Sequence, residues 1–326
     1  MNTTAIPLPL LSISVITIGH QSEGDLVDLL PQLLADAPAL GMEIVVVDNA
    51  STDGTRALLD RYRRDIMIIT NDRNRGFGAA VNQGLQRTRG QYVLLLNPDA
   101  RIDPDAIRSL KGYLDTHAAT GAVAPRLEYP DGRLQPSRGS FPSVFRTLAS
   151  LFQLKRLMPD DETVMRSPLR FLGRVFRQYA PPQAEEIVDY TTGACVLLRR
   201  SALDTAGAFD ESFFLYYEEI DLAKRLKEAG YNWVYLDRVI ARHAVAASSD
   251  KAPLRPFLER CRSMCYYYSK HHSFRAGFIV RQMLYITILI RWLLILIHPR
   301  FRLDPRVPIA EETAVYRRLL RRRTHI

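Results

Sequence analysis

Residues 43–51, EIVVVDNAS, form an apolar run that stops abruptly in polar residues. Three other stretches have the same form: LSISVITI at 11–18, DIMIITN at 65–71 and QYVLLLNPDA at 91–100. Segments with helical spacing lie between and after them, at 25–34, 55–64, 76–89 and 105–117. Because the runs are apolar on both faces and alternate with helices, the sequence predicts an α/β domain. Its sheet should be mainly parallel and flanked by helices.

Ligands of such sheets bind beyond the carboxyl ends of the strands, which is where Asp48 and Asp99 lie. The turn that follows the first of these strand ends contains Asn49 and Asp53, whose polar groups suit a base or a ribose. The same turn is equally suited to capping a helix that begins at Thr55. The turn alone therefore leaves ligand binding and helix capping open.

The next polar segment is NDRNRGFGAAVNQGL, residues 71–85. Gly76 and Gly78 open a helix after a strand, with Arg75 close by, and a helix amino terminus favours a diphosphate. The segment lacks the third glycine of a dinucleotide-binding fingerprint. Asn82 either faces this site or is an ordinary exposed residue.

Carboxylates that suit metal binding and proton transfer follow. Asp99, after Asn97 and Pro98, is placed to hold Mg²⁺ or Mn²⁺ on phosphate oxygens, or it is simply a turn residue. His243 either completes that metal site or is structural. Glu218 and Glu219 follow aromatic residues, which favours a raised pKa and a general base, although acids in a first helical turn also complement the helix dipole.

Composition restricts the class of protein. The 326 residues carry a net charge of +9, which indicates an anionic partner, and no nucleic-acid recognition module is visible. Three cysteines do not make a disulfide framework, which favours a reducing compartment. The amino terminus resembles a buried strand more than a signal peptide, so we expect the chain to remain in the cytoplasm.

The chain divides into a predicted catalytic domain at 1–248 and a basic, helical, membrane-associating region at 249–326. Within the first, the Pro- and Arg-rich stretch 133–188 is expected to be an insertion: an acceptor-binding or membrane-facing element, or a plain surface excursion. The apolar run at 277–302 is long enough to cross a bilayer, but Arg281 and Arg291 interrupt it. An interfacial or re-entrant helix pair, with the arginines reaching the headgroups, is therefore preferred to a simple span, and a core or oligomer-interface helix is the alternative.

The order of these segments resembles the family 2 glycosyltransferases with a GT-A fold, especially their rhamnosyltransferase-like branch. The motifs are Asp48-Asn49-Ala50-Ser51-Thr52-Asp53-Gly54-Thr55, Asn74-Arg75-Gly76-Phe77 with Asn82, Leu96-Asn97-Pro98-Asp99, Thr192-Gly193-Ala194, Phe213 to Leu222, and His243. The similarity covers residues 11 to 272. Three features differ from the family pattern. Ile18-Gly19-His20 replaces the usual end of the first strand, Glu218-Glu219 replaces a Glu-Asp pair, and the segment after His243 is rich in Ala where the family often has Gly.

The resemblance implies a Rossmann-like GT-A domain and a set of roles. Asp99 and His243 would bind a divalent metal, Mg²⁺ or Mn²⁺, and Glu219, or else Glu218, would deprotonate the acceptor. The nucleotide sugar would be bound by Thr17, Asp48, Asn49, Asp53, Arg75, Gly76, Asn82, Asn97 and Asp99.

The implied enzyme is an inverting transferase that uses dTDP-rhamnose or a similar nucleotide diphosphate sugar. Its acceptor would be a lipid-linked glycan at the cytoplasmic face of the bacterial inner membrane, with peripheral or monotopic attachment and a possible homo-oligomer. Two other functions are weighed against it: a non-catalytic, nucleotide-sugar-binding membrane scaffold, and a nucleotidyltransferase, for which Gly19-His20 offers no Gly-rich loop.

Overall fold

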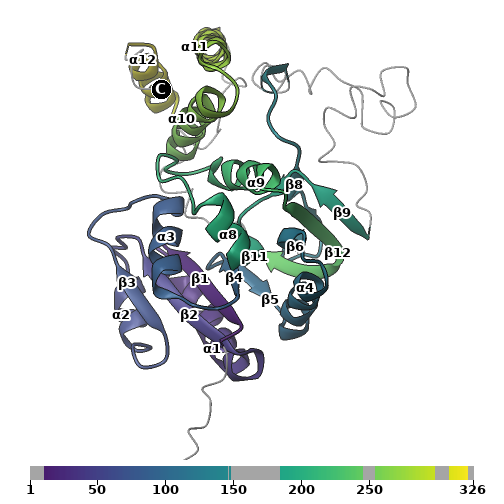
Figure 1. Ribbon diagram of the computed structural model, residues 1–326. Coiled ribbons are helices and arrows are strands. Elements are labelled where there is room, and N and C mark those ends of the chain that lie inside the picture. Colours follow the sequence, from purple (N-terminus) through teal and green to yellow (C-terminus); the bar gives the residue numbers. More distant parts are fainter. Residues whose placement is uncertain (1–10, 146, 148–183, 245–253, 298–307, 322–326) are drawn as a thin grey trace, which may run out of the picture. The chain divides into compact units, whose positions relative to one another are not determined.

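The computed structural model describes residues 11–145, 147, 184–244, 254–297 and 308–321 (Figure 1). The chain forms two compact units. The first contains the chain up to Ser140, together with Ala180–Phe214 and Glu218–Ser248, and the second contains Phe141–Tyr179, Leu215–Tyr217 and Ser249–Ile326. Most of the predicted insertion at 133–188 lies outside the described residues.

The first unit is built around a mixed, mostly parallel sheet (Figure 1). The spatial order is β3 (Met67–Thr70), β2 (Met42–Asp48), β1 (Ile13–Gly19), β4 (Tyr92–Leu96), β11 (Cys195–Arg199), β6 (Thr120–Glu128), β12 (Asn232–His243) and β5 (Ala100–Ile102). The strands β1 to β4 are parallel neighbours, as are β6 and β12, whereas β11 runs antiparallel between β4 and β6. This confirms the α/β class and the parallel pairing expected from the four apolar runs.

The predicted strand at 91–100 is wrong at its end. The strand β4 stops at Leu96, and β5 is a separate strand paired with β12. Pro98 has no N–H for a ladder, and the N–H of Ala100 closes a turn on the carbonyl of Asn97 at 3.0 Å. The break turns the chain at the carboxyl edge of the sheet.

Short strands extend the sheet on the side of β6 and β12. The strand β7 (Leu134–Gln135) pairs with β6, and β9 (Glu185–Val188) pairs with β12. A separate two-stranded ladder joins β8 (Arg138–Gly139) to β10 (Tyr190–Thr191). This ladder ties together the two ends of the intervening chain segment.

Helices cover both faces of the sheet, which explains why its strands are apolar throughout. On one face, Val46 packs in the same core as buried leucines of α1 (Glu23–Leu40). On the other, Val45 and Val47 pack on Ala80 of α3 (Phe77–Arg87). The remaining helices of this unit are α2 (Thr55–Asp60), α4 (Pro104–Thr116), α8 (Arg200–Ala206) and α9 (Glu218–Glu228) (Figure 1).

The second unit contains α10 (Leu254–His271), α11 (Phe274–Ile297) and α12 (Ile309–Arg321), and α11 packs on both of the others. Among the described residues, α11 is the one helix long and apolar enough to cross a membrane. One stripe of it is buried: Gly277, Val280, Leu284, Tyr285, Ile288 and Ile295. Another stripe is apolar but exposed: Phe278, Ile279, Ile286, Leu289, Ile290, Leu293, Leu296 and Ile297.

Candidate active site

The loops that follow β1 and β2 are joined by hydrogen bonds of Gln21. Its side-chain oxygen accepts from the N–H groups of Thr52 and Asp53 at 3.3 and 3.0 Å, and its own N–H donates to Ser51 Oγ at 2.9 Å. Gln21 and Ala50 have positive φ angles of 57° and 67°, which are strained for residues with a Cβ. The network holds both strained residues in place and makes the two loops one rigid platform.

Asp48, at the end of β2, is fully buried and its carboxylate is occupied by the protein. Oδ1 accepts from the N–H of Ser51 at 3.0 Å, and Oδ2 accepts from Arg56 Nε at 2.8 Å. Arg56 also donates to the carbonyl of Asn71 at 2.9 Å. Asp48 therefore stabilises the loop after β2 through its bonds to Ser51 and Arg56. The role of Arg56 was not predicted from the sequence.

Asn49 connects the same platform to the loop before α3. Its Nδ2 donates to Asn74 Oδ1 at 3.0 Å and to the carbonyl of Gly76 at 3.1 Å. Its Oδ1 accepts from Asn71 Nδ2 at 3.1 Å and from the N–H of Arg75 at 2.9 Å, while the side chain of Arg75 is exposed. The structure thus brings Asp48, Asn49, Arg75 and Gly76 together.

Asp53 and Thr17 are two further residues predicted to bind the nucleotide. Partial burial raises the pKa of Asp53, but hydrogen bonds from Thr55 and Glu23 outweigh it and lower the pKa. The N–H of Thr55 donates to Asp53 Oδ1 at 3.1 Å, which is the capping arrangement weighed above. Thr17 lies fully buried on β1, and its hydroxyl makes no hydrogen bond within the described part of the chain.

The amino end of α3 contacts the segment that leads to the acidic pair. Gly76 has a φ of 88°, and a Cβ there would collide with the carbonyl oxygen of Phe214. The N–H of Phe77 donates to that same oxygen at 2.9 Å. Asn82 is buried and bonded to this segment as well: it donates to the carbonyl of Phe209 at 2.9 Å and accepts from its N–H at 3.0 Å. Asn82 therefore braces the loop through its amide group.

Asp99 and His243 meet at the carboxyl edge of the sheet. His243 Nε2 lies 3.2 Å from Asp99 Oδ1 and 3.4 Å from Asn97 Nδ2, and its Nδ1 donates to Gln135 Oε1 at 3.0 Å. Both side chains of the pair are largely buried. Gln135, on β7, is a partner that the sequence did not reveal.

This donor set fits a divalent cation. A histidine that ligates a metal usually gives its other ring N–H to an oxygen, as His243 does to Gln135. Among the described residues, no group of three or more His, Cys, Asp or Glu side chains is arranged to hold a metal. Two protein ligands suit Mg²⁺ or Mn²⁺, which take further oxygens from phosphates and water.

Asp25, in the first turn of α1, belongs to the surroundings of this pair. Burial and the charge of Asp99 raise the pKa of Asp25, and Arg101 opposes them. Arg101 donates to the carbonyl groups of Asp25, Pro98 and Ala100. Negative charge is thus concentrated beside Asp99, and a cation at the pair would offset it.

Glu218 and Glu219 begin α9. Glu218 is 5% exposed, and burial followed by the charge of Glu219 raises the pKa of Glu218 well above its usual value of 4.5. Glu219 is only half-buried. Asp221, also in the first turn, is fully buried and forms an ion pair with Arg225 at 2.9 Å, one turn further along the same helix, which stabilises α9. The pair therefore combines a buried acid of raised pKa with a half-buried neighbour, one of whose carboxylate oxygens, Oε2, is itself buried.

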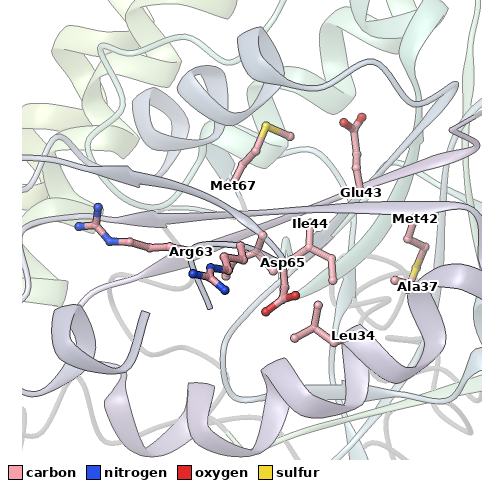
Figure 2. Close-up of a pocket in the computed structure, with 10 residues that line it drawn as sticks. Leu34, Ala37, Met42, Glu43, Ile44, Arg63, Asp65 and Met67 are labelled. Carbon is pink, nitrogen blue, oxygen red and sulfur yellow. The ribbon is translucent and has the colours of Figure 1, made fainter. Parts of the chain in front are cut away.

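A pocket of about 450 Å³ lies elsewhere (Figure 2). Its lining includes Met42 and Glu43 at the start of β2 and Met67 at the start of β3. It is therefore at the amino ends of these strands, opposite the polar loops. Figure 2 shows Leu34 and Ala37 of α1 along one side of it.

The chain is similar to known sugar transferases. The model of the family described as glycosyl transferase family 2 matches residues 14–207. An N-acetylglucosaminyl-diphospho-decaprenol L-rhamnosyltransferase of Mycobacterium tuberculosis is 29% identical over 244 residues, which cover 71% of this chain and 76% of the relative. A low-salt glycan biosynthesis hexosyltransferase, Agl10, of Haloferax volcanii is 28% identical over 238 residues, which cover 71% and 67%.

Two solved structures have a similar fold. The mannosyltransferase PcManGT of Pyrobaculum calidifontis, in complex with GDP-Man and Mn²⁺, superposes with a TM-score of 0.55 at 17% identity, covering 96% of this chain and 84% of that one. GalNAc-T7 with UDP, GalNAc and Mn²⁺ gives a TM-score of 0.55 at 13% identity, covering 96% of this chain but only 55% of that one. At such low identity these likenesses concern the fold alone.

Proposed function

We propose a function from one premise: the chain belongs to glycosyl transferase family 2 and has the GT-A fold. The reaction moves a sugar from a nucleotide diphosphate donor to a hydroxyl group of a lipid-linked glycan, with inversion at the anomeric carbon. The mycobacterial relative's name supports rhamnose as the sugar, hence dTDP-rhamnose as donor, and a lipid diphosphate on the acceptor.

The contact between Asp99 and His243 carries this proposal, because it lies at the edge of the sheet where β1 and β2 also end. The donor would lie across that edge. Its base and ribose would lie on the platform of Thr17, Asp48, Asn49 and Asp53. Its diphosphate would approach Arg75, Gly76, Asn97 and Asp99, with Asn82 bracing the loop behind them.

Asp99 Oδ1 and His243 Nε2 would hold Mg²⁺ or Mn²⁺. When bound, the cation would supply charge neutralisation for the departing diphosphate. Gln135 fixes the ring of His243 so that Nε2 points at Asp99. The two manganese-containing structural neighbours support the use of such an ion in this fold.

Glu219 is the proposed base, since it is less buried than Glu218, whose pKa is raised well above its usual value by burial and by the charge of Glu219. Its carboxylate takes the proton of the acceptor hydroxyl while that oxygen attacks the anomeric carbon. The bond from the anomeric carbon to the phosphate oxygen breaks on the opposite side, and the nucleoside diphosphate leaves with the electron pair. One displacement of this kind inverts the anomeric centre.

The exposed stripe of α11 supports attachment at a membrane surface, which is where a lipid-linked acceptor resides. The two arginines within the helix both have contacts in the protein. Arg281 lies 5.7 Å from the centre of the Phe278 ring, and Arg291 lies near Tyr316 of α12. The helix would lie in the interface with its buried stripe against α10 and α12. The proposed location is the cytoplasmic face of the bacterial inner membrane.

The decisive experiment offers the full chain a panel of nucleotide sugars together with a synthetic N-acetylglucosaminyl lipid diphosphate. We expect transfer of rhamnose from dTDP-rhamnose, abolished by EDTA and restored by Mn²⁺. Glu219→Gln should lower kcat by about 10²- to 10⁴-fold with donor binding retained, whereas Glu228→Gln, at the exposed end of α9, should not. Binding of donors without any transfer would instead favour the scaffold function.

A further inference from the structure

The three residues before the acidic pair belong to the second unit, although the chain on either side of them belongs to the first. Within the second unit they lie against one face of α10. The carbonyl of Leu215 accepts from Ser263 Oγ at 2.8 Å. The guanidinium of Arg260 lies 4.7 Å from the centre of the Tyr216 ring, and the ring centres of Tyr217 and Tyr267 are 5.5 Å apart.

The three partners on α10 form a single surface. Arg260, Ser263 and Tyr267 are spaced i, i+3 and i+7, so they lie on one side of the helix. Each engages a different residue of Leu215–Tyr217, through a hydrogen bond, a cation–π contact and an aromatic contact. Ser263 and Tyr267 are both buried.

The segment they hold is strained. Tyr216 and Tyr217 have φ angles of 67° and 70°, and two consecutive aromatic residues in the left-handed region are unfavourable. Such a conformation persists only where the surroundings enforce it, and it is characteristic of functional segments. The contacts with α10 are the enforcing surroundings within this unit.

The conformation of Tyr217 decides where the next residues point, because Tyr217 is bonded directly to Glu218, the first residue of α9. We propose that Arg260, Ser263 and Tyr267 of α10 position the acidic pair by holding Leu215–Tyr217 in its left-handed conformation. The inference rests on the proposed function, in which Glu219 is the base. The three are positioning residues, since they act through the backbone of 215–217 and not on the substrate.

The test measures kcat, donor KM and the pH dependence of kcat for single variants of the full chain. We expect Arg260→Leu and Tyr267→Ala to lower kcat by about tenfold, as release of the strain displaces the base. Donor KM should be unchanged, and the acidic limb of the pH profile should move. Tyr267→Phe, which keeps the ring, should retain normal turnover.

Two further variants separate positioning from a loss of folding. Arg262→Leu is the matched control: Arg262 is on the same helix, half-exposed and paired with Glu259, so its loss should leave kcat unchanged. Tyr216→Gly removes the strain that Arg260 offsets, so it should restore part of the kcat lost in Arg260→Leu. A purely structural role for Arg260 predicts additive losses in that double variant.

The inference is overturned if Arg260→Leu and Tyr267→Ala fold with normal kcat, or if their losses appear only in the amount of folded protein and are not rescued by Tyr216→Gly. Glu219→Gln distinguishes this failure from failure of the proposed function. An inactive Glu219→Gln beside fully active α10 variants removes the positioning role alone. An active Glu219→Gln removes the base assignment on which both depend.

Discussion

His243 presents one ring nitrogen to Asp99 and gives the other to Gln135. With Nδ1 donating to Gln135, Nε2 faces a carboxylate oxygen of Asp99 at 3.2 Å and the amide nitrogen of Asn97 at 3.4 Å. A divalent cation bound here would be held by both the ring nitrogen and the carboxylate oxygen. The geometry therefore adds to the residue types the observation that these two donors face one another.

Gln135→Ala should weaken that cation site without removing a ligand. The ring of His243 would lose the bond that orients it, so the Mn²⁺ concentration for half-maximal activity should rise by about 10- to 100-fold. Metal titration of initial rates checks this. Gln86→Ala, an exposed amide on α3, is the control, and an unchanged titration for Gln135→Ala would argue against the assigned role of His243.

Glu218 gives a pH dependence of stability. An unfolded chain releases its proton near pH 4.5, whereas burial and Glu219 keep it bound in the folded protein at higher pH. The folded state therefore binds more protons in this window, and stability falls as pH rises through it. Glu218→Gln should remove this fall, so its gain in thermal midpoint over the parent should grow with pH above 4.5. Parallel curves for the two proteins would contradict the raised pKa, and Glu228→Gln should follow the parent.

At the scale of elements, the contact between the start of α3 and Phe214 depends on a missing side chain. Gly76→Ala must place a Cβ against the carbonyl oxygen of Phe214 at a positive φ, which should destabilise the protein by about 2 kcal/mol or more and reduce transfer. Gly24→Ala is the matched control, since nothing lies within 4 Å of its added Cβ in α1. It should be neutral or stabilising by up to about 1 kcal/mol. Thermal unfolding and activity together decide between the two outcomes.

The first four strands could be predicted because each is an apolar run with a polar end. For β1, β2 and β4 this pattern reflects burial on both faces, whereas the edge strand β3 is only partly buried. The reversed direction of β11 could not be predicted, because strand direction depends on partners far along the chain and not on local sequence. The strand β7 could not be predicted for the same reason. It has only two residues, one of which is Gln135, the partner of His243.

The candidate site, like the fold, could be predicted only in part. Polar residues at strand ends were found, and Asp99 and His243 do come together. What the sequence did not reveal is which polar atoms remain available to a ligand. Asp48, Asn49 and Asn82 direct their polar atoms to protein partners, and Arg56, Asn71 and Asn74 look like ordinary loop residues until those bonds are seen.

At the scale of the whole molecule, we expect the exposed apolar stripe of α11 to bind a membrane surface. Replacing Leu289 and Leu293 by Glu should reduce sedimentation with anionic vesicles by about tenfold or more, since each leucine contributes about 1.5 kcal/mol or more when buried in lipid. Val27→Glu, an exposed apolar position on α1, is the control. Undiminished sedimentation of the double variant would leave the membrane role of α11 without support.

The ladder between β8 and β10 has a consequence for how such enzymes diversify. Tyr190 pairs with Gly139 and Thr191 with Arg138, and Arg138 also forms an ion pair with Glu186. The segment between β8 and β10 therefore starts and ends at adjacent, paired positions. Because the ladder already holds both ends of this segment together, a longer or different segment adds little to the entropic cost of closing the loop. A different segment can therefore replace the chain between β8 and β9, in evolution or by design, without a change in the strand register of the large sheet.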